Sequence, residues 1–176
     1  MLKKVLSEID LYTGKIETPK GFEIDRKTIK NSILPNYSSK EASSRDCKVD
    51  YSPPLQWLQD YIRDHWREAY RKSLFPKSMW GIVLQPNEES PLRHTVEPLD
   101  LINSPDYTFI YGIDVPEKDC ECVIHYDKNR RANKTWHIPL KNNKFIMFPS
   151  TQKFYISKNT SEQLITLLTI TYGYIE

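Results

Sequence analysis

The 176-residue chain has little glycine and little cysteine, and each shortage excludes a class of function. Its 5 glycines stand against 12 prolines, and neither GxxxxGK[ST] nor GxGxxG occurs, so the chain lacks a glycine-rich loop for nucleotide phosphates. The cysteines at positions 47, 120 and 122 are too few for a disulfide framework. Cys120 and Cys122 form a C-x-C pair with no second pair to complete a tetrahedral zinc site. We therefore expect reduced thiols and a cytosol-like compartment.

Excess charge of one sign and long hydrophobic runs are also missing. The net charge is +2 and basic residues alternate with acidic ones along the chain, so a role in neutralising nucleic-acid phosphates is not expected. Residues 1–15 lack the apolar core of a signal peptide, and no stretch approaches the 18 apolar residues of a membrane span. We expect no export through a signal peptide, no membrane contact and no direct nucleic-acid binding.

Residues 1–54 are polar and irregular, and we interpret them as an N-terminal extension or arm with short helices. One helix is predicted over residues 2–9. A second is predicted from about Asp25, a suitable N-terminal cap, to Leu34, where Pro35 stops it.

The next segment has the period of a helix. Pro53 and Pro54 precede apolar residues that recur at spacings of three and four, namely Leu55, Leu58, Ile62, Trp66 and Ala69. This pattern predicts an amphipathic helix over residues 55–75 that packs its apolar stripe on the outside of a sheet.

From residue 79 the hydrophobic period changes to 2. Short β-rich runs alternate with turn segments such as NEESP and KNTSE, with no helix between them, which predicts an antiparallel sandwich or jelly roll over residues 79–176. In residues 107–115 the odd positions share one face. In the last run one face is expected to carry Leu164, Leu168, Ile170 and Tyr172, and the other Ile165 and Leu167.

Three segments within residues 79–174 carry a family resemblance. They are W-G-I-V-L-Q-P-N-E-E-S-P-L-R-H from Trp80 to His94, F-I-Y-G-I-D-V-P-E from Phe109, and the F-P-S turn that ends at Ser150 before the closing strand. Their order resembles the phage and marine-bacterial branch of the iron(II)/2-oxoglutarate oxygenases. The resemblance implies a mainly β fold, a double-stranded β-helix or jelly roll.

Enzymes of that family hold iron with two histidines and one carboxylate, and a basic side chain on the last strand pairs with 2-oxoglutarate. The resemblance places His94 at the first histidine, Val96 at the carboxylate and Phe154 at the second histidine. No arginine follows Arg131, so the final strand also lacks the usual cation. The resemblance thus implies a degenerate form without most of its metal and co-substrate ligands.

Two functions are compatible with the absence of these metal and co-substrate ligands from the sequence. The preferred one is a non-catalytic jelly-roll module without a cofactor, which binds other protein subunits in an oligomer or larger assembly. Arg130 and Arg131, in a predicted turn, are candidate partner contacts. Because the resemblance is to phage-encoded proteins, we expect this module to be a virion component of the neck, tail or capsid. It would then be located in the host cytoplasm or the virion.

The alternative is an iron(II)/2-oxoglutarate-dependent oxygenase with a rearranged metal site. Its iron ligands would be His94, Glu97 and His137, with His125 as a substitute for the last, and 2-oxoglutarate would bind Lys153 and Lys158. A metal-free pocket for a small molecule in the mouth of the jelly roll is a third possibility. We expect aromatic side chains to fill that mouth instead, among them Trp80, Tyr107, Phe109, Tyr111, Trp136, Phe145, Phe148 and Tyr172.

Overall fold

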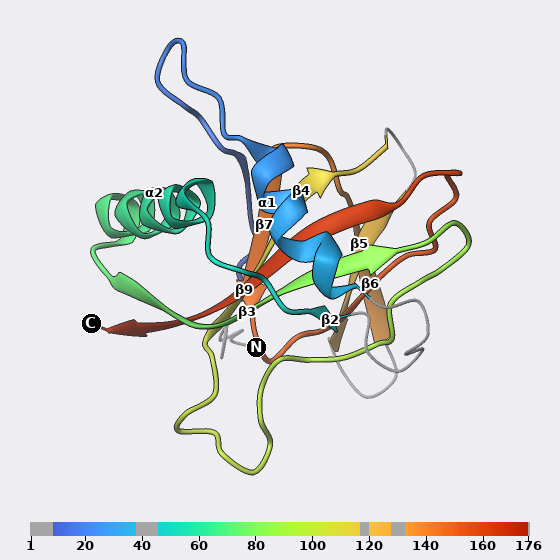
Figure 1. Cartoon of the computed structure of the whole chain (residues 1–176). Helices are drawn as coiled ribbons and strands as arrows, with labels where there is room; N and C mark the ends of the chain where they lie inside the picture. Colours follow the sequence, from blue (N-terminus) through green and yellow to red (C-terminus); the bar gives the residue numbers. More distant parts are fainter. Residues whose placement is uncertain (1–8, 38–45, 117–119, 128–132, 176) are drawn as a thin grey trace.

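The computed structural model describes residues 9–37, 46–116, 120–127 and 133–175, which form two facing antiparallel sheets with both α-helices on one side (Figure 1). The larger sheet has the strand order β1-β7-β4-β9-β3-β2 and the smaller one β6-β5-β8. In chain order the strands are β1 (Tyr12–Lys15), β2 (Asp46–Cys47), β3 (Ser73–Leu84), β4 (Tyr107–Asp114), β5 (Glu121–Asp127), β6 (Asn133–Pro139), β7 (Lys144–Pro149), β8 (Lys153–Ile156) and β9 (Ile165–Ile175).

The smaller sheet is extended by one residue pair beyond β8. Arg93 and Phe154 exchange backbone hydrogen bonds, at 2.9 Å from the Arg93 N–H and 2.7 Å from the Phe154 N–H. Apart from this bridge, residues 85–106 form a long connection between β3 and β4. This arrangement is a double-stranded β-helix, so the predicted fold class is confirmed.

The larger sheet buries a hydrophobic cluster on each face. Strand β9 presents Leu168, Ile170 and Tyr172 to the helices, and Ile165 and Leu167 to the smaller sheet, as its alternation predicts. Strand β4 also follows the prediction from Tyr107 to Ile113. Val115 lies in the cluster between the sheets instead, because the register of β4 against β9 shifts between Gly112 and Asp114.

Helix α2 (Pro53–Tyr70) packs on the larger sheet through the predicted stripe, of which Leu55, Leu58, Ile62 and Trp66 are buried. It ends at Arg71, whose φ of 59° is left-handed. The chain then enters β3 at Ser73, paired with Ile175, so the helix is shorter than residues 55–75 and the sheet starts before residue 79. Among the described residues, no helix combines the length and apolar character needed to cross a bilayer.

Helix α1 (Arg26–Ile33) begins and ends where the sequence predicts. The Asp25 carboxylate accepts a hydrogen bond of 3.0 Å from the Thr28 N–H, and a single 3₁₀ turn, η1 (Leu34–Asn36), follows. This hydrogen bonding also lowers the pKa of Asp25. The helix predicted over residues 2–9 falls, except for Ile9, outside the described residues. The N-terminal extension supplies both edge strands of the larger sheet, β1 beside β7 and β2 beside β3.

Candidate functional site

The Arg93–Phe154 bridge brings together the two positions that the resemblance assigns to metal-binding histidines. His94 directly follows Arg93, so its segment lies beside the strand of Phe154. The imidazole is partly buried, and its Nδ1 is buried with no hydrogen-bond partner among the described residues. The residue that pairs with Phe154 and lies over its ring is Arg93, one position before His94.

The neighbouring position carries a phenyl ring. Phe154 is 0 % exposed and belongs to the cluster between the two sheets. Its ring meets that of Phe148 edge-to-face, with the centroids 5.2 Å apart. A hydrocarbon ring therefore occupies the space in which the second imidazole of an iron site would be needed.

Arg93 covers this ring from the other side. Its guanidinium lies between two aromatic rings, 5.7 Å from the centroid of Phe154 and 5.5 Å from that of Trp80. Its Nη1 also makes an ion pair of 2.5 Å with Asp46 of β2. Nothing in the sequence marks Arg93 for this position, because the strands that bring its partners together are far apart along the chain.

Some hydroxyls in the sandwich interior hydrogen-bond to one another, whereas Thr169 Oγ1, Trp80 Nε1 and Arg93 Nε are buried with no hydrogen-bond partner among the described residues. Thr108 Oγ1 lies 2.6 Å from Thr95 Oγ1 and 2.9 Å from Ser150 Oγ, the serine of the F-P-S turn. Ser78 and Thr171 form a similar pair at 2.6 Å. These neutral groups satisfy each other and supply no charge to the interior.

The same interior also contains two thiols. Cys120 and Cys122 are both buried in the cluster between the sheets. Burial raises the pKa of the Cys122 thiol, so it remains protonated rather than becoming a thiolate ligand.

The rearranged metal site, with His94, Glu97 and His137, is not assembled. Glu97 is exposed, and its carboxylate accepts a hydrogen bond from the Leu99 N–H at 3.3 Å. His137 lies opposite Val123 on the outer face of the smaller sheet, because the intervening positions of β5 and β6 face inward. Its Nδ1 is 2.9 Å from Glu121 Oε2.

His125, the substitute ligand, also faces outward, with its ring centroid 5.8 Å from that of Tyr155. Among the described ranges, no three His, Cys, Asp or Glu side chains are grouped so as to hold a metal ion.

The candidate co-substrate cations lie outside the sandwich as well. Lys153 is exposed on the face of β8 opposite to that of Phe154, and Lys158 is exposed beyond the end of β8. Arg130 and Arg131, the candidate partner contacts, lie outside the described residues. Within the described ranges, the side chains around Phe154 include no second imidazole and no carboxylate grouped with His94, which does not fit a facial triad for iron(II).

The aromatic residues expected in the mouth divide between several places. Phe148 lies between the sheets and is 1 % exposed. Phe109, Tyr111 and Tyr172 are buried on the other face, under the helices, and Tyr107 and Phe145 pack against them. Trp136 is 58 % exposed on β6. Of the aromatic side chains, Phe148 and Phe154 therefore fill the space between the sheets, and most of the others that were expected there lie elsewhere.

No protein-family model matches the sequence, and a search of the curated proteins finds no match. Solved structures do match. The viral collagen prolyl hydroxylase of Paramecium Bursaria Chlorella virus-1, in a truncated form, is 12 % identical with a TM-score of 0.63, over 94 % of this chain and 90 % of that one. AviO1 from Streptomyces viridochromogenes Tue57 is 12 % identical with a TM-score of 0.62, over 93 % and 89 %.

An oxidoreductase of the 2OG-Fe(II) oxygenase family from Burkholderia pseudomallei is 8 % identical with a TM-score of 0.55. The match covers 73 % of this chain but only 62 % of the Burkholderia protein. At these identities the likeness concerns the backbone arrangement. The chain therefore has the double-stranded β-helix fold of the iron(II)/2-oxoglutarate oxygenases, in a form that lacks most of their metal ligands.

Proposed function

We propose that this chain is a non-catalytic binding module built on the oxygenase fold. The observation that carries the proposal is the Arg93–Phe154 bridge, which sets a buried phenyl ring near the Arg93 side chain at the position that the resemblance assigns to the second metal-binding histidine. A site with one imidazole and no carboxylate has too few donors to hold iron(II) in a facial triad. The fold is kept, and the interior is stabilised by packing instead of by metal coordination.

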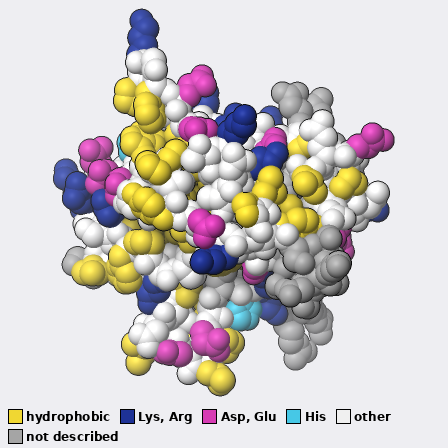
Figure 2. All heavy atoms as spheres, viewed as in Figure 1, with side chains coloured by type: hydrophobic (Ala, Val, Ile, Leu, Met, Phe, Trp, Pro, Cys, Tyr) yellow, Lys and Arg dark blue, Asp and Glu magenta, His cyan; other side chains and the backbone are white. Residues whose placement is uncertain are grey.

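The connection between β3 and β4 supports a binding role. It projects from the sandwich at the lower end of Figure 1, where Figure 2 shows hydrophobic and acidic side chains together. Leu99, Leu101 and Ile102 are 95 %, 69 % and 94 % exposed. Exposed apolar groups that gather in one place are typical of protein interaction sites. We infer that this connection contacts another protein subunit; a place in a virion stays a prediction from the resemblance.

The runner-up is an iron(II)/2-oxoglutarate-dependent oxygenase, which the solved structures with this fold favour. That function requires Glu97 and His137 to leave the positions described above and turn toward His94. One experiment separates the two functions. The purified protein is loaded anaerobically with iron(II), washed and analysed for bound metal, and then assayed for succinate release from 2-oxoglutarate.

We expect no stoichiometric iron and no succinate. Stoichiometric iron that is lost in His94→Ala, or any 2-oxoglutarate turnover, would establish the oxygenase instead. The subunit contact is tested by sedimentation velocity. Self-association should be weakened by the double variant Leu99→Asp with Ile102→Asp, and not by Lys158→Asp, a change at an exposed site outside the connection. A protein that stays monomeric at all concentrations would contradict self-association through this connection.

A further inference from the structure

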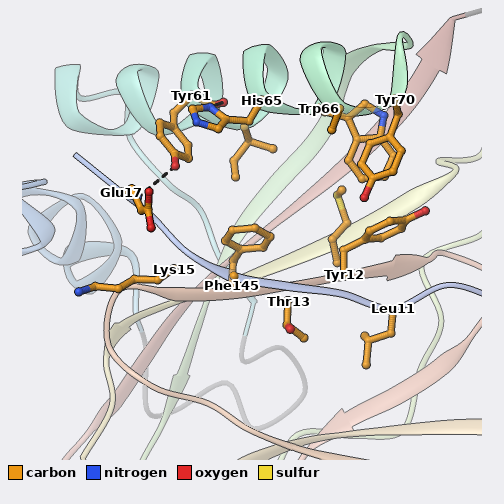
Figure 3. Close-up of a pocket in the computed structure, with 14 residues that line it drawn as sticks. Leu11, Tyr12, Thr13, Lys15, Glu17, Tyr61, His65, Trp66, Tyr70 and Phe145 are labelled. Carbon is orange, nitrogen blue, oxygen red and sulfur yellow. Dashed lines mark hydrogen bonds between the residues drawn. The ribbon is translucent and has the colours of Figure 1, made fainter. Parts of the chain in front are cut away.

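A cleft of 580 Å³ lies on the outer side of the larger sheet, beneath α2 (Figure 3). Its roof is made by side chains of α2 and its floor by β1 and β7. Aromatic side chains from all three elements line it, namely Tyr61, His65, Trp66 and Tyr70 from α2, Tyr12 from β1 and Phe145 from β7. The larger sheet separates this cleft from the sandwich interior, so what it binds does not depend on whether that interior holds iron.

The rings at one end of the cleft form a rigid cluster. The centroid of Tyr12 is 4.8 Å from that of Trp66 and 5.2 Å from that of Tyr70, both in edge-to-face contact. Trp66 is buried, whereas Tyr70 is 45 % exposed. The cluster is therefore held in place by the core while part of its π surface remains open to solvent.

The charged residues that line the cleft are Glu17 and Lys15. The Glu17 carboxylate lies at the end opposite to the Tyr12 cluster, and Figure 3 shows the Glu17 backbone N–H joined to the Tyr61 hydroxyl by a hydrogen bond of 3.1 Å. No hydrogen bond or ion pair within the described part of the chain engages that carboxylate. Lys15 also lines the cleft, but its ammonium extends away from the rings (Figure 3).

A second carboxylate acts at the other end. Asp10 accepts a hydrogen bond of 3.2 Å from the Tyr12 hydroxyl. Burial, with the charge of Asp10 added to it, raises the pKa of Tyr12, so this phenol stays neutral at physiological pH. The cleft thus presents aromatic rings together with the Glu17 carboxylate, while Asp10 accepts the hydrogen bond of Tyr12 and does not itself line the cleft.

We propose that this cleft binds an organic cation, and specifically a quaternary ammonium group. Aromatic rings attract a cation through their quadrupoles, and Glu17 adds a charge that a neutral ligand cannot use. A primary ammonium has three N–H donors, for which the lining offers the Glu17 carboxylate and tyrosine hydroxyls but no acceptor on the rings that make up most of the lining. A trimethylated ammonium has no N–H donor, and its methyl groups pack directly on the rings.

The test is a titration followed by two-dimensional amide NMR with two probes of nearly equal shape, choline and its uncharged carbon isostere 3,3-dimethylbutan-1-ol. Choline should shift the amides of β1 and of the second half of α2, and bind about tenfold more tightly than the isostere, since a factor of ten corresponds to the upper range of a cation–π gain. Acetyl-trimethyllysine amide and acetyl-lysine amide test whether the cation can be carried by a protein side chain.

Two variants locate the site. Glu17→Gln should weaken choline binding several-fold and leave the isostere unchanged. Tyr70→Leu, which replaces the ring by a smaller apolar side chain, should weaken choline. Glu23→Gln removes another exposed carboxylate that does not line the cleft, and should leave choline binding unaltered. The amide spectrum of each variant reports whether it remains folded.

Equal binding of choline and the isostere would overturn the proposal, as would the absence of a saturable shift at these amides up to about 50 mM choline, a range that covers millimolar affinity. Acetyl-lysine amide binding as tightly as its trimethylated form would overturn the quaternary class. Tighter binding of acetyl-trimethyllysine amide than of choline would support the proposal and identify a modified protein as the source of the cation.

Discussion

Truncation of Phe154 tests the central claim that a packed ring has replaced a metal ligand. The side chain is 0 % exposed, lies in the cluster between the sheets and contacts the Phe148 ring edge-to-face. Transfer of a phenylalanine side chain from water to a core contributes about 1.5–3 kcal/mol, and the cavity left behind raises the cost of Phe→Ala to about 3–5 kcal/mol. For a chain of this size that loss corresponds to a fall in Tm of about 6–20 °C.

The assay is urea denaturation of wild type and Phe154→Ala, followed by tryptophan fluorescence and circular dichroism. Phe22→Ala is the control, because Phe22 is 45 % exposed and its loss should cost less than about 1 kcal/mol. If Phe154 instead bordered an open ligand cavity, its truncation would cost no more than that of Phe22. A change in the free energy of unfolding below about 1 kcal/mol for Phe154→Ala would therefore refute the packing argument.

Three further results are expected. The double variant Val96→Asp with Phe154→His supplies the missing donors next to the existing histidine, so cobalt(II) should bind and give a visible absorption spectrum that neither single variant shows. Burial raises the pKa of Tyr111 from 10.0 to about 12. Because the unfolded chain then loses the phenol proton first, the free energy of unfolding should be constant below pH 10 and fall by about 2–3 kcal/mol as the pH rises to 12, as measured by urea denaturation at each pH. Gly112→Ala places a Cβ 2.1 Å from the backbone oxygen of Lys141, which should cost about 3 kcal/mol or more in the same assay.

The helices and the long strands could be predicted because their signals are local. The apolar stripe of α2, the Asp25 cap of α1 and the alternation of β9 all lie within a few residues of one another in sequence. The position of Phe154 followed from its spacing to the F-P-S turn. The structure pairs Phe154 with Arg93, one residue before the histidine to which the resemblance assigns the first ligand.

The edge strands β1 and β2, and the choice of which residues of β6 point inward, depend on pairings between residues far apart in the sequence. Strand β1 has 4 residues and β2 has 2, too few for a periodic pattern, and both are defined by their partners β7 and β3. In β6 the alternation separates Trp136 from His137 but does not say which of them faces inward. The pairing with β5 decides that His137 faces outward.

The cleft beneath α2 escaped prediction for a related reason. Its floor comes from β1, which was not predicted as a strand, and its aromatic cluster joins Tyr12 to Trp66. One local signal was present in α2. Trp57, Tyr61 and His65 recur at a spacing of four, and their rings stack successively, with centroids 5.3 Å and 3.8 Å apart. An aromatic row beside the apolar stripe therefore indicates a second surface on this helix.

The contacts of Arg93 explain how the segment of His94 stays beside β8 without a metal. In an oxygenase the iron would link the first histidine to the second across these two segments. Here the Arg93–Phe154 bridge joins them, together with hydrogen bonds between Ser90 and Ile156 and between Glu88 and Asn159. Arg93 adds side-chain contacts, because its guanidinium lies 5.7 Å from the centroid of the Phe154 ring and 5.5 Å from that of Trp80 while it is paired with Asp46. A cation is thus retained close to the position where the family binds iron, but it belongs to the chain itself, and its charge is balanced by a strand of the N-terminal extension.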